Sequence, residues 1–149
     1  MAKRFHILLA DDDADDRFFF KKALEELTAA VHLSTVANGE ELMHFLSKNI
    51  GQLPDLLFLD LNMPRKNGSE CLAEIKQNKK LQDLPVIIYS TSLNEDVADI
   101  LYANGAHYYV RKTGIAELKK TLEWVLMLML EKKFARPPRN KFILAPVQV

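Results

Sequence analysis

The sequence predicts an α/β fold, in which a parallel β-sheet carries helices on both faces. Short apolar runs alternate with amphipathic segments along the chain, a pattern typical of strands joined by helical crossovers. Residues 56–60 form the most apolar run, which indicates a central strand covered on both faces. The length of 149 residues and the apolar content of 48% fit one folded domain.

The first three strand–helix units follow from the spacing of apolar residues. In the first helix Phe20, Leu24 and Leu27 recur at the spacing of one helix face, so this face should turn inward. The second strand is more polar than the others. The expected strands are residues 5–10, 32–37 and 56–60, and the expected helices are residues 14–28, 39–48 and 69–77.

Two further units are marked by caps and by residues that stop a helix. Asn94 is suited to cap a helix that ends just before Gly105, a residue type common after helix C-termini. The last helix begins at Thr113 or Gly114 and runs to about Ala135, shortly before two consecutive prolines that cannot continue it. The strands of these units are expected at residues 85–90 and 107–111.

The composition argues against several classes of protein. Lys and Arg total 20, as do Asp and Glu, so the zero net charge does not favour binding to nucleic acid or to a membrane surface. A single cysteine excludes a disulfide within the chain and fits a reducing cytoplasm. The longest apolar stretch, residues 124–130, is shorter than a spanning helix, and no secretory signal is recognisable. We therefore expect a cytoplasmic protein.

Polar side chains stand where the expected strands end. In chain order they are Asp11 and Asp12, Asp60, Ser90 and Lys112. The carboxyl ends of parallel strands share one edge, where such folds bind ligands, so these groups should meet. Three converging carboxylates would repel one another, and a hard divalent cation such as Mg²⁺ relieves that repulsion. The carboxylates alone would suit a structural Ca²⁺ ion equally well.

The lysine and the hydroxyl favour a site that receives an anion. A phosphoryl group on Asp60 would bring three oxygens, which the cation, the Lys112 ammonium and the Ser90 hydroxyl could neutralise. Asp60 would then act as a carboxylate nucleophile. Neither the phosphate-loop motif GxxxxGK[ST] nor the hydrolase motif GxSxG occurs, and the four histidines lack metal-ligand spacing.

Four segments stand out in order along the chain: ILLADDD (7–13), LLFLDLNMPRKNG (56–68), PVIIYSTS (85–92) and GAHYYVRK (105–112). Together they resemble the response regulator receiver domain of two-component signalling, and the resemblance covers roughly residues 5–130. It implies a flavodoxin-like, doubly wound (βα)5 three-layer sandwich, with a five-stranded parallel sheet of order 2-1-3-4-5.

The resemblance also implies the roles of the acidic residues. A partner histidine kinase or phosphotransfer protein would phosphorylate Asp60. A Mg²⁺ or Mn²⁺ ion would be bound directly by Asp12, through water by Asp11, and by Asp60 and the backbone carbonyl of Asn62. Lys112 would pair with the phosphoryl group.

A conformational switch is implied as well. Ser90 matches the hydroxyl residue that moves toward the phosphoryl group, and Tyr109 matches the aromatic residue whose rotamer follows that movement. In one respect the chain differs from the family, which usually has proline after the lysine, often joined by a cis bond. Here Thr113 follows Lys112, and we expect a trans bond because a cis bond before a non-proline residue costs about 2.5–4 kcal/mol.

We expect residues 1–134 to form the receiver domain and residues 135–149 a C-terminal extension, with no separate output domain. The extension is too short for a helix-turn-helix unit, so output would pass by contact with another protein. The chain would be a phosphoacceptor signalling protein rather than an enzyme, similar to stand-alone receivers that pair with phytochrome-type histidine kinases. The alternative is a constitutive receiver-fold scaffold that binds a partner without phosphorylation.

The last helix also indicates self-association. Trp124, Met127 and Leu128 lie on the side opposite the apolar stripe that should face the sheet. A homodimer through the fourth helix, fifth strand, fifth helix and C-terminal tail would cover them. Alternatively, residues 142–147 fold back over them within one chain, and an exchanged tail would satisfy both interpretations. The stripe expected to face the sheet consists of Leu118, Leu122, Val125 and Met129.

Overall fold

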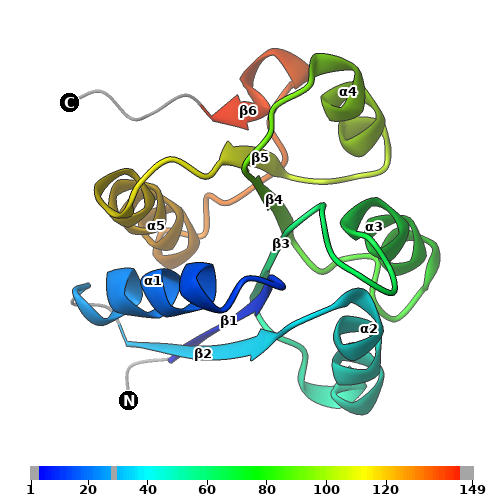
Figure 1. Ribbon diagram of the computed structural model, residues 1–149, viewed down its shortest axis with the longest axis horizontal. Helices are drawn as coiled ribbons and strands as arrows, with labels where there is room; N and C mark the ends of the chain where they lie inside the picture. The colour runs from blue at the N-terminus through cyan, green and yellow to red at the C-terminus, as the bar shows by residue number, and fades with distance from the viewer. Residues whose placement is uncertain (1–3, 28–29, 145–149) are drawn as a thin grey trace.

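The computed structural model describes residues 4–27 and 30–144, which contain a six-stranded sheet (Figure 1). All neighbouring strands are parallel, and their order is β2-β1-β3-β4-β5-β6. The doubly wound α/β fold and the order of the first five strands are therefore confirmed. The strands are β1 (Phe5–Ala10), β2 (Val31–Val36), β3 (Leu56–Leu59), β4 (Val86–Ser90), β5 (Tyr108–Arg111) and β6 (Ile143–Leu144).

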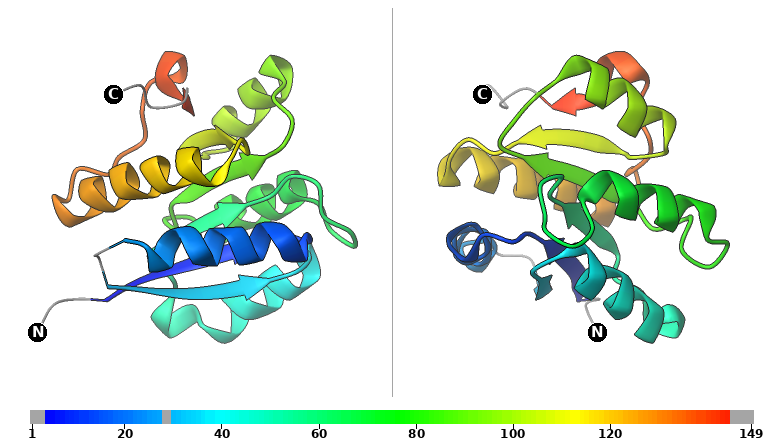
Figure 2. Two further views of the ribbon diagram at one scale, coloured as in Figure 1. Left: turned by 60° about the vertical axis from the view of Figure 1, so that its left-hand side comes forward. Right: turned by 45° about the vertical axis from the view of Figure 1, so that its right-hand side comes forward.

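Helices cover both faces of the sheet, which makes three layers. Figures 1 and 2 show α1 beside α5 on one face, and α2, α3 and α4 on the other. In the described ranges, no helix is long and apolar enough to cross a membrane. The helices are α1 (Ala14–Glu25), α2 (Gly39–Lys48), α3 (Gly68–Gln77), α4 (Glu95–Ala103) and α5 (Ile115–Leu130), with short 3₁₀ turns η1 (Ile50–Gln52) and η2 (Arg139–Lys141).

Side-chain caps determine where the first four helices begin. Asp13, Asn38, Asn67 and Asn94 each accept a hydrogen bond from a backbone N–H in the first turn. At α3 the cap is reciprocal, because the Glu70 carboxylate also accepts from the N–H of Asn67. These helices start just beyond the carboxyl ends of the strands, so the caps also position the loops at that edge of the sheet.

Two apolar clusters fill the spaces between the layers. Leu8, Leu57 and Ile88 face α2, α3 and α4, whereas Ile7, Phe58 and their neighbours face α1 and α5. Strand β3 is buried along its whole length, as expected for the central position. Full burial of a side chain as large as Phe58 contributes about 1.5–3 kcal/mol, so this strand is a rigid support for the residue that follows it.

Helix α5 ends at Leu130, earlier than the predicted end near Ala135. Lys132 has a φ angle of 57°, in the left-handed region where a helix cannot continue. The Lys133 N–H donates to the Leu128 carbonyl at 2.8 Å, and the Lys132 N–H donates to the Met129 carbonyl at 3.1 Å. This Schellman arrangement usually has glycine where Lys132 stands, so the sequence did not indicate the stop. Helix α1 ends at Glu25, and Thr28 of the predicted helix lies outside the described residues.

The C-terminal tail folds back over β5 and α4, and not over the outward side of α5 as expected. Ile143 and Leu144 pair with the outer edge of β5, and Phe142 is fully buried in the cluster that faces α4. The predicted sheet of five strands was therefore one strand short. Residues 145–147 of the predicted covering segment lie outside the described residues.

The outward side of α5 is only partly exposed. Met127 leaves 47% of its surface accessible, but Trp124 packs edge-on against Tyr108 with ring centroids 5.4 Å apart, and Leu128 is half-buried. Of the four residues predicted to face the sheet, Leu118, Leu122 and Val125 are buried. The fourth, Met129, is partly buried at the margin of the apolar cluster between the sheet and helices α1 and α5. Self-association through this side of the helix stays a prediction.

Candidate functional site

The residues predicted at the strand ends meet at one edge of the sheet. The N–H of Asp60 donates to the Ala10 carbonyl at 2.9 Å, and the N–H of Lys112 donates to the Ser90 carbonyl at 2.7 Å. These bonds extend the strand pairing by one residue beyond β3 and β5. They fix the backbone of Asp60 and of Lys112, so the positions of these two side chains follow from the register of the sheet.

Three carboxylates converge there. Asp11, Asp12 and Asp60 each contribute an oxygen, and these oxygens lie within 4.8 Å of one another. Asp11 and Asp60 are buried, whereas Asp12 is exposed, so the cluster opens to solvent on one side. Burial raises the pKa of Asp11 to about 6, although a hydrogen bond from Lys112 opposes the rise. Hard oxygen ligands, excess negative charge and an open side are what a divalent cation requires.

Lys112 is the positive centre of the site. Its Nζ lies 2.7 Å from Asp11 Oδ2, 2.9 Å from Asp16 Oδ2 and 3.2 Å from Asp60 Oδ2. Burial works against the charged form, but the hydrogen bonds with Asp11 and Asp16 outweigh it and raise the pKa of the Lys112 ammonium. The lysine is therefore held charged beside Asp60, where an incoming anion would meet it.

Sequence reasoning missed two neighbours of this lysine. Asp16 lies in the first turn of α1, which begins just beyond β1 and so carries this carboxylate over the strand end. Its position five residues after Asp11 in the acidic run was the available signal. The Tyr89 ring, centred 5.2 Å from the Lys112 Nζ, could not be inferred, because only the pairing of β4 and β5 brings it there.

The predicted switch residues lie on neighbouring strands. Ser90 is fully buried, and its hydroxyl has no hydrogen-bond partner in the part of the chain that the structure describes. Tyr109 is also buried, and its hydroxyl donates to the Ser92 carbonyl at 2.6 Å. An unpartnered buried hydroxyl costs free energy, so Ser90 would gain from an acceptor brought within its reach.

Two loops border the site: the loop that follows Asp60 and the loop that follows Lys112. The N–H of Asn62 donates to Asp60 Oδ1 at 3.2 Å and orients that carboxylate. No cis peptide bond occurs in the described ranges, so the bond between Lys112 and Thr113 is trans, as predicted. Arg65 has a φ angle of 68°, which produces the sharp turn from β3 back to α3.

Gly68 allows this turn to pack against the backbone of Asp60. A Cβ at this position would lie 2.3 Å from the Asp60 carbonyl oxygen and 2.8 Å from the Leu61 Cα, both backbone atoms. We expect Gly68→Ala to lower the free energy of unfolding by about 1–3 kcal/mol, as overpacking does, and to displace Asp60. Urea denaturation measures the change. Gly51→Ala is the matched control, since nothing lies within 4 Å of its added Cβ, and equal losses in both variants would contradict the argument.

Comparison with known proteins agrees with this geometry. The family model of the response regulator receiver domain matches residues 7–123. The response regulator Rcp1 of Synechocystis sp. is 34% identical over 133 residues, which cover 84% of this chain and 88% of Rcp1.

Two solved structures are similar over almost the whole described chain. The phosphorylated cyanobacterial phytochrome response regulator RcpA superposes with a TM-score of 0.78 at 32% identity, covering 87% of this chain and 96% of RcpA. The Mn²⁺-bound form of Rcp1 superposes with a TM-score of 0.76 at 32% identity, covering 90% of this chain and 99% of Rcp1. The chain therefore belongs to the response regulator receiver family of two-component signalling, and its acidic pocket is the phosphoacceptor pocket of that family.

Proposed function

We propose that this receiver is a phosphorylation switch in which Asp60 accepts a phosphoryl group from a histidine kinase or a phosphotransfer protein. The observation that supports this proposal most directly is the position of the Asp60 carboxylate, 3.2 Å from the Lys112 ammonium at the open carboxyl edge of the sheet. A buried ammonium fixed beside a carboxylate nucleophile is suited to an anionic reactant. A cation-binding site alone would have no use for it.

The transfer step is a displacement at phosphorus. An Asp60 oxygen forms the new bond to phosphorus, and the bond from phosphorus to the donor imidazole nitrogen breaks. The imidazole then takes up a proton from solvent. Lys112 pairs with one phosphoryl oxygen, and the Ser90 hydroxyl donates to another, which satisfies a group that has no other partner among the described residues.

Asp11, Asp12, Asp60 and the backbone carbonyl of Asn62 are the residues that would hold a divalent cation. We propose Mg²⁺, with Mn²⁺ as a substitute, because hard oxygen ligands at a partly open site suit both ions. When bound, the ion supplies positive charge that offsets the phosphoryl oxygens. The manganese-bound structure of Rcp1 supports a divalent ion at a receiver of this type.

Signal output in this proposal passes by protein contact. Ser90 and Tyr109 carry the change at Asp60 to α4, β5 and α5, and the protein catalyses only the uptake and loss of its own phosphoryl group. Residues 1–134 act as the receiver domain and residues 135–149 as its extension, in a cytoplasmic protein. Homodimerisation is supported by exposed apolar side chains on α4 and α5, where Ile100, Ile115 and Met127 leave 59%, 46% and 47% of their surfaces accessible.

Intact-mass measurement after incubation with acetyl phosphate tests the proposal. With Mg²⁺ we expect one phosphoryl adduct per chain, and with excess EDTA we expect none, because the negative charge at the site is then not offset. Circular dichroism in both conditions shows that the protein stays folded. A folded protein that takes up no phosphoryl group, either from acetyl phosphate or from a histidine kinase, would favour the constitutive scaffold.

A further inference from the structure

The loop that carries Lys112 joins α5 without the side-chain cap found at the other helices. Helices α1 to α4 are each capped by an accepting side chain, whereas the cap position of α5 is Gly114, which has no side chain to accept. Thr113 and Gly114 are exposed, and a Cβ added at Gly114 would meet nothing within 4 Å in the described ranges. The direction of the lysine side chain therefore depends on the contacts of its own atoms.

The Lys112 side chain is enclosed, and an aromatic ring forms part of the enclosure. Its accessible surface is only 9%. The ammonium donates to three carboxylates, and its Nζ also lies 5.2 Å from the centre of the Tyr89 ring. This distance is close enough for cation–π attraction, which is stronger where water is excluded. The ring thus attracts the ammonium and limits the movement of the flexible four-carbon stem.

The Tyr89 ring is itself held firmly in the core. Its side chain is buried in the apolar cluster between the sheet and helices α1 and α5. It meets Phe20 of α1 and Phe58 of β3 in edge-to-face geometry, with ring centroids 5.9 Å and 6.1 Å away. These two phenylalanines also pack on each other, with centroids 5.0 Å apart. Lys112 is therefore in contact with a ring whose position the core determines.

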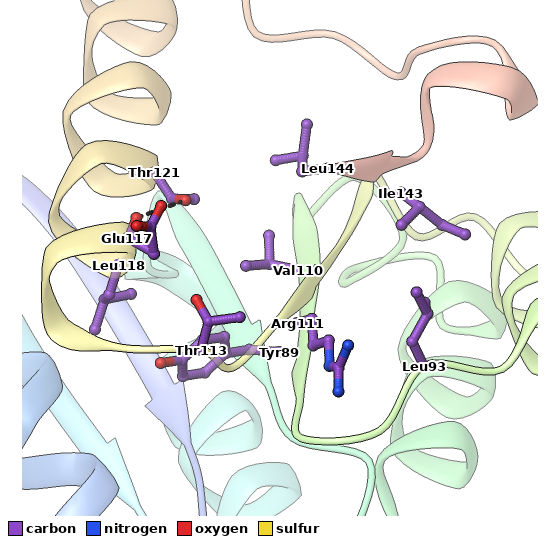
Figure 3. Close-up of a pocket in the computed structure, with 10 residues that line it drawn as sticks. All are labelled: Tyr89, Leu93, Val110, Arg111, Thr113, Glu117, Leu118, Thr121, Ile143 and Leu144. Atoms are coloured by element: carbon purple, nitrogen blue, oxygen red, sulfur yellow. Dashed lines mark hydrogen bonds between the residues drawn. The ribbon is translucent and has the colours of Figure 1, made fainter. Parts of the chain in front are cut away.

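Tyr89 also stands between two cavities. The first, of about 300 Å³, lies between β5, β6 and α5, and Figure 3 shows Tyr89 beside Thr113 at one end of it. The second, of about 390 Å³, is lined by Lys112. Tyr89, Thr113 and Leu118 line both cavities. Removal of the ring would join the two spaces and give the lysine stem room to turn away from Asp60.

From these contacts we propose that Tyr89 is a positioning residue for phosphoryl transfer, which acts by keeping the Lys112 ammonium directed at Asp60. Stabilisation of the charge that develops on the phosphoryl oxygens depends on groups held in place beforehand. An ammonium free to turn into an adjoining cavity would stabilise this charge less. The inference rests on the proposed function and adds to it a residue that acts through the lysine.

Substitutions of Tyr89 test the role of the ring. With acetyl phosphate and Mg²⁺, Tyr89→Leu is expected to take up the phosphoryl group about 10-fold more slowly than the native chain, because the carboxylates still hold part of the ammonium in place. Tyr89→Phe keeps the ring and should restore the native rate. Tyr108→Leu is the matched control, since Tyr108 is buried to the same 7% in the same cluster but packs against Trp124 and Phe134.

A double-mutant cycle separates positioning of the lysine from a general packing defect. In the Lys112→Met background, Tyr89→Leu should cause no further loss of rate, because the group through which it acts is absent. A packing defect would slow uptake in both backgrounds alike. Circular dichroism shows whether each variant is folded. Tyr89→Met, which is unbranched and fills irregular space, gives the same comparison if the leucine variant is unstable.

Acetylation of lysines measures the position of Lys112 without Mg²⁺ or a phosphodonor. In the native chain Lys112 is enclosed and should react slowly with an amine-specific reagent, whereas Lys119, with 38% of its side chain accessible, serves as the internal reference. Tyr89→Leu should speed acetylation of Lys112 by a factor similar to the loss in uptake rate and leave Lys119 unchanged. Peptide masses identify the modified lysine.

Three results in the uptake assay would each overturn the inference while leaving the proposed function intact. They are equal slowing by Tyr89→Leu and Tyr108→Leu, equal slowing by Tyr89→Phe and Tyr89→Leu, and an undiminished effect of Tyr89→Leu in the Lys112→Met background. Unchanged acetylation of Lys112 in Tyr89→Leu would overturn the inference as well. Absence of an adduct on the native chain would overturn the proposed function, and the acetylation rates would still decide whether Tyr89 positions the lysine.

Discussion

Asp60→Asn is expected to abolish the phosphoryl adduct under conditions that label the native chain completely. An amide oxygen carries no negative charge and does not attack phosphorus, so no acyl phosphate can form. The substitution nearly preserves shape, and the Asn62 N–H, which lies 3.2 Å from Asp60 Oδ1, can still donate to the asparagine oxygen. The loss would therefore reflect chemistry and not misfolding. Intact mass measures the adduct, and its removal by hydroxylamine identifies it as an acyl phosphate.

Asp55→Asn is the matched control for this variant. Asp55 stands at the opposite end of β3, where its Oδ2 accepts from the His6 N–H at 2.9 Å, and asparagine retains an oxygen for that bond. We expect native labelling in this control. A stable adduct on Asp60→Asn, mapped to another aspartate, would move the acceptor role away from Asp60.

Lys112→Met is expected to slow phosphoryl uptake from acetyl phosphate about 10²–10³-fold, the usual effect of removing one preorganised group that stabilises developing charge. The ammonium is fixed within 3.2 Å of Asp60 Oδ2, and methionine fills similar space without the charge. A bound divalent cation would retain part of the stabilisation, so some labelling should remain. The time course of adduct formation gives the rate.

Lys119→Met removes a lysine whose Nζ lies 3.5 Å from Glu26 on the surface, and it serves as the control. Surface ion pairs contribute little, so its uptake rate should match that of the native chain. If Lys112→Met labels as fast as this control, the lysine has a structural role in separating the carboxylates and no role in the transfer.

Local sequence patterns were sufficient to predict the elements that bury a continuous apolar face. The five strand–helix units and the strand-end residues were all found, because alternation of apolar runs reports directly on a parallel sheet. The strand order, in contrast, came only from the family resemblance. Strand β6 was missed because Ile143 and Leu144 are too few to form a pattern, and they become a strand only where β5 offers an unpaired edge.

Parts of the site depended on tertiary packing in the same way. Asp11, Asp12, Asp60 and Lys112 were predictable, since each stands at the end of a strand. The contact of Asp16 with Lys112 depends on how α1 leaves β1, which periodicity does not specify. The burial of Trp124 against Tyr108 depends on how α5 lies across the sheet, so a face that looked free in sequence is partly covered.

Strand β6 also bears on the solubility of the protein. Without it β5 would be an edge strand, and the unpaired N–H and C=O groups of an edge strand invite pairing with other chains and aggregation. The edge is protected by two paired residues and the buried ring of Phe142, all near the end of the chain. We therefore expect concentrated protein to begin to aggregate when this short segment detaches from β5, even at temperatures where the core remains folded.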